Sequence, residues 1–401
     1  MKTYLLLLSG LNLLLAAFII ITFEKSFLVY AQKLDNNDTE IIVSTPTKAN
    51  ATETAATKAN ATETAATKAN ATETAATKAN ATETTNKKNM KFCYNSQFGS
   101  LGTGDGQFNR PHDIVFDSKG FLYINDRELN NFQKFSPDGK FISKFGEKGE
   151  ELGQFKSPYS MAIDSDDNIY VLDRGNDRVQ KVSTDGTPLG ALYSYDGEWI
   201  TNNDDISKTD KKDKKPSKEE KLKHFASPEA MTIDKDGNYY MTDTGHNRII
   251  KFDKNFKYIS YFGVEGSGPG QFSHPHGIGV DSEGNIYVNE LNHARIQKFT
   301  NDGKFIKQWG SNGTAPGQFT LPLEHLKVDK NDRIFITDGA DNPRVQVFDN
   351  NGKYLTQFGK FGTGPGEFDL PEHVAFDEKD DKGTVYVVDR GNARIQTFLP
   401  C

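Results

Sequence analysis

Residues 270–310 contain Gly270-Gln271-Phe272-Ser273-His274-Pro275, then Gly277-Ile278-Gly279-Val280-Asp281, Asn285-Ile286-Tyr287-Val288, Ala294-Arg295-Ile296-Gln297-Lys298-Phe299 and finally Gln308-Trp309-Gly310. Short runs with alternating apolar residues are separated by Asp, Asn and Gly. This alternation predicts short strands joined by tight turns. The stretch therefore predicts a unit made of several strands and no helix.

The same pattern occurs six times between Gly106 and the C-terminus. The Asp that ends the first strand marks each copy, at Asp117, Asp164, Asp234, Asp281, Asp329 and Asp377, with spacings of 47, 70, 47, 48 and 48 residues. A period of about 40–50 residues with four short strands per unit is typical of propeller blades. Because one blade cannot bury both of its faces, the predicted fold class is all-β, a six-bladed β-propeller of four-stranded blades over residues 91–401.

The recurring Gly-Gln-Phe start and the Arg-Ile/Val-Gln-x-Phe strand make residues 91–401 resemble the NHL-repeat family. The resemblance implies a propeller that binds proteins, peptides or RNA on one face. Some relatives also carry a RING module and act as ubiquitin ligases. Cys93 and Cys401 are the only cysteines here, fewer than the four close Cys/His ligands that a tetrahedral zinc module needs.

The last copy ends after its third strand, with only Leu399-Pro400-Cys401 beyond Phe398. Residues 92–99 parallel the fourth strand of the clearest copy, so we expect the N-terminal strand to complete the last blade. This closure removes an open sheet edge. In the same alignment, Cys93 and Cys401 flank one hairpin turn, which predicts a Cys93–Cys401 disulfide that staples the ring.

An uncharged run extends from Thr3 to Phe23. Its length favours a retained signal-anchor helix that tethers the chain to a membrane, although Val29-Tyr30-Ala31 also fits a cleavage site. Residues 1–31 are therefore a signal-anchor or a signal peptide, and in both cases the chain is exported. The anchored form predicts a cell-surface protein.

Residues 32–90 form a low-complexity Thr/Ala/Asn segment built on a ten-residue repeat. Small polar residues without an apolar period cannot build a core, which predicts an unfolded stalk. N-glycosylation acceptor sequences begin at Asn37, Asn50, Asn60, Asn70 and Asn80 in this segment, and at Asn312 in the propeller. Sugars at these sites would extend and shield the stalk.

The spacing of 70 residues between Asp164 and Asp234 indicates an insertion, at about 193–224. This insertion is rich in Lys, Asp and Glu. Propeller topology places it between an outermost strand and the next innermost strand, on the channel-entry face. The plain interpretation is a solvated charged loop. The alternative is a lid or partner-binding element, because long loops in compact domains are often functional.

An acidic residue follows the second strand of each copy, and five copies place an Arg near the start of the third. These structural pairs are Asp173/Arg178, Asp243/Arg248, Glu290/Arg295, Asp338/Arg344 and Asp389/Arg394. We expect each carboxylate to accept hydrogen bonds from the guanidinium and to tie the two strands together. In the first copy Asn131 replaces the Arg.

The position that begins the innermost strand differs between blades, and reads His112, Tyr159, Glu229, His276, Glu324 and Glu372. Varied side chains on a rigid scaffold are where specificity is placed. We therefore take these six as candidate ligands at the channel mouth. His and Glu converging on one opening also suit a divalent metal such as Zn or Ca, although a binding function requires no cofactor.

NHL-type propellers include the lyase that finishes peptide C-terminal amidation, which holds zinc with three channel His and uses a Tyr and an Arg. His112 and His276 look similar to two of those ligands, and Tyr159 occupies a comparable position. A third His and an Arg have no counterpart in the ring, and His325 and His373 lie one place further along. These departures put the metal site in doubt.

The sequence thus predicts an extracellular, membrane-tethered propeller that acts as a binding module for a protein, peptide or glycan. The formal net charge of −7 and the pI of about 5.7 argue against a nucleic-acid partner. The alternative is a metal-dependent lyase or hydrolase at the channel mouth. A third possibility is a purely structural envelope component.

Overall fold

The computed structural model describes residues 90–401 except 210–216, 321–322, 340 and 378. The predicted N-terminal helix, the stalk up to residue 89, and Asn37, Asn50, Asn60, Asn70 and Asn80 lie outside the described residues.

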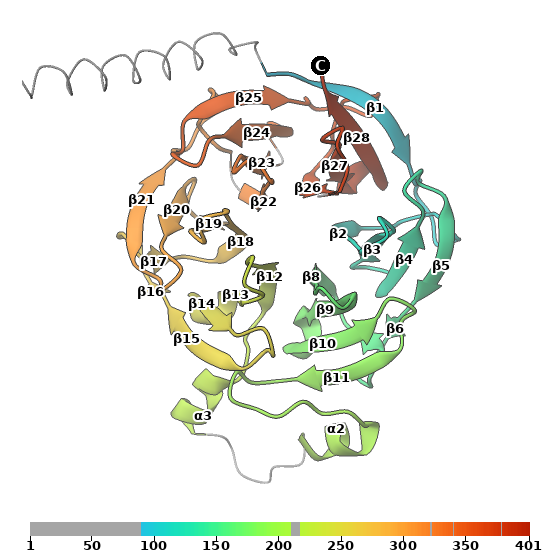
Figure 1. Cartoon of the computed structure of the whole chain (residues 1–401), viewed down its shortest axis with the longest axis vertical. Coiled ribbons are helices and arrows are strands. Elements are labelled where there is room, and N and C mark those ends of the chain that lie inside the picture. Colours follow the sequence, from blue (N-terminus) through green and yellow to red (C-terminus); the bar gives the residue numbers. More distant parts are fainter. Residues whose placement is uncertain (1–89, 210–216, 321–322, 340, 378) are drawn as a thin grey trace, which may run out of the picture. The chain divides into compact units, whose positions relative to one another are not determined.

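Six four-stranded antiparallel sheets surround a central channel (Figure 1). From the channel outward, the first three blades are β2 (Pro111–Phe116), β3 (Leu122–Asp126), β4 (Asn131–Phe135) and β5 (Phe141–Phe145); β8 (Pro158–Ile163), β9 (Asn168–Asp173), β10 (Arg178–Ser183) and β11 (Pro188–Leu192); and β12 (Pro228–Ile233), β13 (Tyr239–Asp243), β14 (Arg248–Phe252) and β15 (Tyr258–Phe262). The predicted six-bladed propeller is confirmed.

The next two blades are β18 (Pro275–Val280), β19 (Ile286–Glu290), β20 (Ile296–Phe299) and β21 (Phe305–Trp309); and β22 (Leu323–Val328), β23 (Ile334–Asp338), β24 (Arg344–Phe348) and β25 (Tyr354–Phe358). Two short parallel pairs join blades at the rim, β6 (Glu147–Lys148) with β7 (Gln154–Phe155) and β16 (Val264–Glu265) with β17 (Gln271–Phe272). The 3-10 turns η1 (Arg174–Asn176), η2 (Thr244–His246) and η3 (Arg390–Asn392) follow second strands.

The sixth blade contains β26 (Pro371–Phe376), β27 (Val385–Asp389), β28 (Arg394–Pro400) and, as its outermost strand, β1 (Phe92–Phe98). The antiparallel pairing of β1 with β28 closes the ring as predicted. Cys93 and Cys401 form the predicted disulfide across a sequence separation of 308 residues.

The core lies between neighbouring blades, because each sheet buries both faces. One cluster, for example, joins Ile114 and Ile124 of the first blade to Val388 and Ile395 of the sixth. These strands are apolar on both faces and are almost fully buried, which is the pattern of a sheet covered on both sides. The blades therefore hold the channel-lining strands rigidly.

The insertion joins β11 to β12, and its described part contains α2 (Asn203–Thr209) and α3 (Lys218–Lys223). Its aromatic residues pack on the third blade, with the Trp199 ring centroid 5.5 Å from that of Phe256. In Figure 1 both helices lie outside the outer strands β11 and β15 and not over the channel. Within residues 90–401, as far as the structure describes them, no helix is long and apolar enough to cross a membrane.

Candidate functional site

The ring side chains lie at one end of the channel, because each belongs to the second residue of an innermost strand. His112, Tyr159, Glu229, His276 and Glu372 are all buried, and none is more than 8% exposed. Glu324 occupies the equivalent position of β22, and its side chain lies outside the described residues. The ring therefore fills this end of the channel instead of opening it to solvent.

On one side of the ring, His112 and Glu372 come from the first and sixth blades, and Nε2 lies 2.9 Å from Oε1. The Nε of Arg390 lies 2.8 Å from the other Glu372 oxygen. Burial opposes ionisation of Glu372, but His112 and the Arg390 guanidinium outweigh it and hold the pKa of this carboxyl well below its usual value. Glu372 is thus a buried, paired carboxylate.

A second set of side-chain contacts lies on the opposite side of the ring. The Nε of Arg174 donates to Glu229 Oε1 at 3.0 Å, and Glu229 Oε2 lies 3.7 Å from His276 Nε2. His276 Nε2 also lies 3.5 Å from the Tyr159 hydroxyl. The Tyr159 ring stands 4.0 Å from the His112 ring, centroid to centroid, and the Arg127 guanidinium lies 4.5 Å above it. The ring side chains therefore contact one another across the channel.

The three arginines of this site were not among the predicted residues. Arg127, Arg174 and Arg390 each follow the acidic residue that ends a second strand, where the other blades have Thr244, Leu291 and Gly339. A blade-by-blade comparison of that position would have revealed them. They come from three consecutive blades, the sixth, first and second, and contact Glu372, Tyr159 and Glu229 of the ring.

A second layer lies one residue deeper in the strands. His373 Nδ1 lies 3.0 Å from Asp113 Oδ1, and Ser160 Oγ donates to Asp113 Oδ2 at 2.7 Å. The His325 ring lies 4.1 Å from that of His373, centroid to centroid, with Nδ1 3.0 Å from the Leu326 carbonyl oxygen. Burial, with smaller effects from His373 on one imidazole and Lys327 on the other, holds the pKa of His325 and of His373 well below the usual value.

These two imidazoles predict a loss of stability in mild acid. Because their pKa is lowered in the folded state, the unfolded chain binds more protons below the usual pKa of about 6.5. Their contribution to stability is complete above about pH 6.5 and is lost as the pH falls. Each imidazole is expected to lower the free energy of unfolding by about 1.4 kcal/mol between about pH 7.5 and pH 5.5, measured by urea denaturation.

The matched variants are His325→Phe, which removes one imidazole from the buried layer, and His274→Asn, which changes a partly exposed histidine outside it. His325→Phe should lose about half of this pH dependence, and His274→Asn should keep it. A pH dependence that is the same in all three proteins would contradict the assignment.

The acidic–Arg pairs lie behind the ring, between the second and third strands. The Nε–carboxylate distances are 2.7 Å for Arg178–Asp173, Arg248–Asp243 and Arg394–Asp389, 2.6 Å for Arg295–Glu290 and 2.8 Å for Arg344–Asp338. Each guanidinium also donates to backbone carbonyl oxygens of the segment that enters the blade or, for Arg248, to Leu222. In the first blade, Asp126 instead accepts four backbone N–H groups.

Two further expectations concern a metal and a sugar. Among the residues that the structure describes, no group of three or more His, Cys, Asp or Glu side chains is placed to hold a metal ion. The ring imidazoles of His112 and His276 face carboxylates instead. Asn312, the predicted glycosylation site in the propeller, is exposed at a bridge with Phe319.

Comparison with known proteins matches two parts of the ring. A family model described as "6-bladed beta-propeller" matches residues 322–398, and the model "NHL repeat" matches residues 272–299. Protein lin-41 of Caenorhabditis elegans is 46% identical over 46 residues, and E3 ubiquitin-protein ligase TRIM71 of Mus musculus is 43% identical over 44 residues. These segments cover 12% and 11% of this chain but only 4% and 5% of those proteins.

Solved structures match over most of the propeller. A protein of unknown function from Bacteroides thetaiotaomicron has a TM-score of 0.55 and 15% identity over 78% of this chain and 76% of its own. A gluconolactonase from Xanthomonas campestris has a TM-score of 0.52 and 12% identity over 74% of this chain and 88% of its own. At such identities the likeness concerns the fold alone. The six sheets and the two family matches together show that the chain forms a six-bladed β-propeller and contains an NHL repeat.

Proposed function

We propose that this propeller is a binding module for a protein or peptide outside the cell, held at the cell surface by its N-terminal segment. The observation that carries the proposal is a groove of about 390 Å³ between the insertion and the third blade. The Cys93–Cys401 disulfide supports export, because structural disulfides persist in oxidising compartments. The apolar run from Thr3 to Phe23 supports the membrane tether.

A cluster of three tyrosines contributes Tyr195 and Tyr261 to the lining of the groove. The Tyr195 ring of the insertion lies 4.4 Å from that of Tyr258 and 6.4 Å from that of Tyr261, centroid to centroid, both on β15. The Arg248 guanidinium lies 5.2 Å from the Tyr195 centroid and 4.9 Å from that of Tyr261. Because the Arg248 Nε is 2.7 Å from the buried Asp243, the guanidinium is held in place beneath the rings.

The groove also exposes apolar surface. Tyr261 is 49% exposed, and Leu222 of α3 and Val264 of β16, which line the same groove, are 44% and 58% exposed. Tyr and Arg are the residue types enriched where protein partners bind most strongly. Aliphatic and aromatic side chains beside them suit the side chains of a peptide, which favours a protein or peptide over a glycan.

A displayed-peptide library selected on the full chain tests this function. Peptides enriched on the wild-type protein should bind the Tyr195→Ala/Tyr261→Ala variant about 30-fold more weakly, the loss typical of a binding hot spot. Ile306→Ala is the matched control, because Ile306 is 43% exposed on β21, the outer strand of the next blade. Its affinity should equal that of the wild type.

Two outcomes would count against the proposal. Equal affinity of all three proteins for the selected peptides would place their site elsewhere on the propeller. Failure to enrich any peptide, with glycan arrays giving specific binding, would replace the protein or peptide partner by a glycan.

A further inference from the structure

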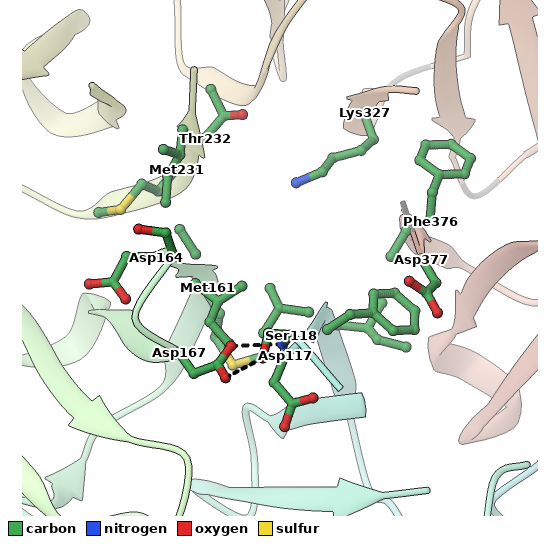
Figure 2. Close-up of a pocket in the computed structure, with 18 of the residues that line it drawn as sticks. Asp117, Ser118, Met161, Asp164, Asp167, Met231, Thr232, Lys327, Phe376 and Asp377 are labelled. Carbon is green, nitrogen blue, oxygen red and sulfur yellow. Dashed lines mark hydrogen bonds between the residues drawn. The ribbon is translucent and has the colours of Figure 1, made fainter. Parts of the chain in front are cut away.

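The other end of the channel is a cavity of about 500 Å³ (Figure 2). Its walls are the last residues of the innermost strands, and most of them are apolar, among them Ile114, Phe116, Met161, Ile163, Met231 and Phe376. Ligand pockets have volumes of about 300–1,000 Å³ and apolar walls with few polar groups. By volume and lining this cavity fits that class.

Toward the other end of the channel, the cavity is followed by the buried side chains of the ring. His112 and Glu372, which approach to 2.9 Å, and the His276–Tyr159 contact at 3.5 Å lie at that level. A ligand would therefore enter from the end where the strands finish in the Asp-turn-Gly hairpins.

Two lysines line this cavity, and they differ in their contacts. The Lys379 amine donates to the Ser118 carbonyl oxygen, whereas Lys327 extends into the apolar space. Figure 2 shows the Lys327 side chain extending from its strand into the cavity. No hydrogen bond or ion pair joins its Nζ to any other residue that the structure describes. The equivalent positions of the other blades are uncharged, Val115, Ala162, Thr232, Gly279 and Ala375. The fifth blade therefore places a lysine, without a partner among the described residues, where the other blades have uncharged side chains.

Among the described residues, the carboxylates that line the cavity have partners other than this amine. Asp167 accepts from the Ser118 N–H of the first blade at 2.7 Å, and the others accept N–H groups of their own turns. Asp117 Oδ1 accepts from the Lys119 and Phe121 N–H groups at 2.9 Å, and Asp164 Oδ1 accepts from the Asn168 N–H at 2.8 Å. Together with Asp377 they make the entrance acidic. An acidic entrance disfavours ligands with several negative charges, because like charges brought together cost free energy.

We propose that this cavity, hereafter the Lys327 pocket, binds a small amphipathic carboxylate, an apolar molecule with one negative charge. The carboxylate pairs with the Lys327 amine, and the hydrocarbon part covers the apolar walls. A charge-assisted hydrogen bond in a mostly apolar site contributes strongly to affinity. The proposal does not depend on the tyrosine groove, which lies at the outer edge of the ring.

Dodecanoate, used below its micelle concentration, is the probe, and binding to the full chain is measured by calorimetry. The Lys327→Met variant should bind it about 10- to 100-fold more weakly than wild type, and Lys327→Arg should keep most of the affinity. Lys235→Met is the control, because Lys235 is an exposed lysine that does not line the pocket. Its affinity should equal that of wild type.

Two further ligands separate the contribution of the charge to the affinity from that of hydrophobic burial. The affinity of wild type for methyl dodecanoate should not exceed the affinity of Lys327→Met for dodecanoate. Wild type should also bind dodecyl phosphate more weakly than it binds dodecanoate. The proposal is overturned if wild type does not bind dodecanoate, if Lys327→Met binds it equally well, or if the phosphate binds more tightly. Unchanged urea denaturation of each variant ensures that a loss reflects the pocket and not the fold.

Discussion

Replacing both Cys93 and Cys401 by serine is expected to lower the free energy of unfolding by about 5 kcal/mol. The disulfide closes a loop with a sequence separation of 308 residues, nearly the whole propeller. In the chain-entropy model, a cross-link stabilises by restricting the unfolded chain, and the effect grows with loop length. The measurement is urea denaturation of the full chain at neutral pH, with and without reductant.

The folded ring gives a second reason to expect a large effect. The sixth blade is the only one of the six whose strands come from both ends of the described chain, β1 and β26 to β28. Without the cross-link, β1 is held by its pairing with β28 and by contacts such as that between the Phe92 and Phe358 rings, 5.1 Å apart between centroids. Release of β1 would expose a long edge of β28, which invites pairing with other chains.

The control is built into the experiment. Reductant should destabilise the wild-type protein by the same amount as the double substitution and should leave the Cys93→Ser/Cys401→Ser variant unchanged. If wild type is equally stable with and without reductant, strand pairing alone holds the ring closed, and the entropic account of the disulfide is wrong for this protein.

The repeat pattern was sufficient to predict the fold because each blade repeats the same physical solution. Two faces must be buried, so every copy keeps the same apolar positions, and the Asp and Gly turns recur at fixed offsets. The truncated last copy then required an N-terminal strand, and the cysteines fell on either side of one turn. Closure of the ring by β1 and the disulfide could therefore be read from residues 92–99 and 399–401.

The site was only partly predictable, because its contacts join different blades. The sequence identified His112 and Glu372 as ring residues, but nothing local indicates that they meet each other or that Arg390 approaches the same carboxylate. Such pairs depend on the angle between blades and on which rotamers fit. Lys327 was missed for a simpler reason. It stands three places beyond the ring residue Glu324, at a position that is uncharged in the other five blades.

The insertion shows a similar limit. Its connection from β11 to β12 follows from topology, but its place does not follow from its many charges. The position of the insertion depends on a few aromatic residues. Trp199 and Tyr195 pack on Phe256 and Tyr258 at the outer edge of the third blade. The charged insertion is thus positioned by its least polar residues.

Arg178→Met is expected to lower the free energy of unfolding by about 3–5 kcal/mol, because it leaves a buried carboxylate without its partner. Arg178 and Asp173 are both fully buried, with Nε 2.7 Å from Oδ2. The same guanidinium donates to the Glu150, Glu151 and Gln154 carbonyl oxygens and to the Tyr193 hydroxyl, at 2.6–2.9 Å. Its removal therefore also leaves four part-buried acceptors without this donor.

The first blade shows what an acidic residue at this position needs when no arginine is present. There Asp126 accepts four backbone N–H groups, from Asn109, Arg110, Glu128 and Leu129. Asp173 accepts one such bond across the blade, from the Lys156 N–H at 2.7 Å, and otherwise relies on Asn176, Arg178 and Gln180 side chains. The second blade thus depends on its arginine in a way that the first does not.

Urea denaturation of three variants distinguishes the stability contributed by the buried Arg178–Asp173 pair from a general effect of removing a charge. Lys181→Met is the matched control, since Lys181 lies on the same strand and its amine is 3.6 Å from the partly exposed Asp164. A partly exposed pair of this kind should cost less than about 1 kcal/mol. The Asp173→Leu/Arg178→Met double variant removes both charges and should be more stable than Arg178→Met alone. Equal losses for Arg178→Met and Lys181→Met would mean that the buried pairs do not hold the strands of a blade together.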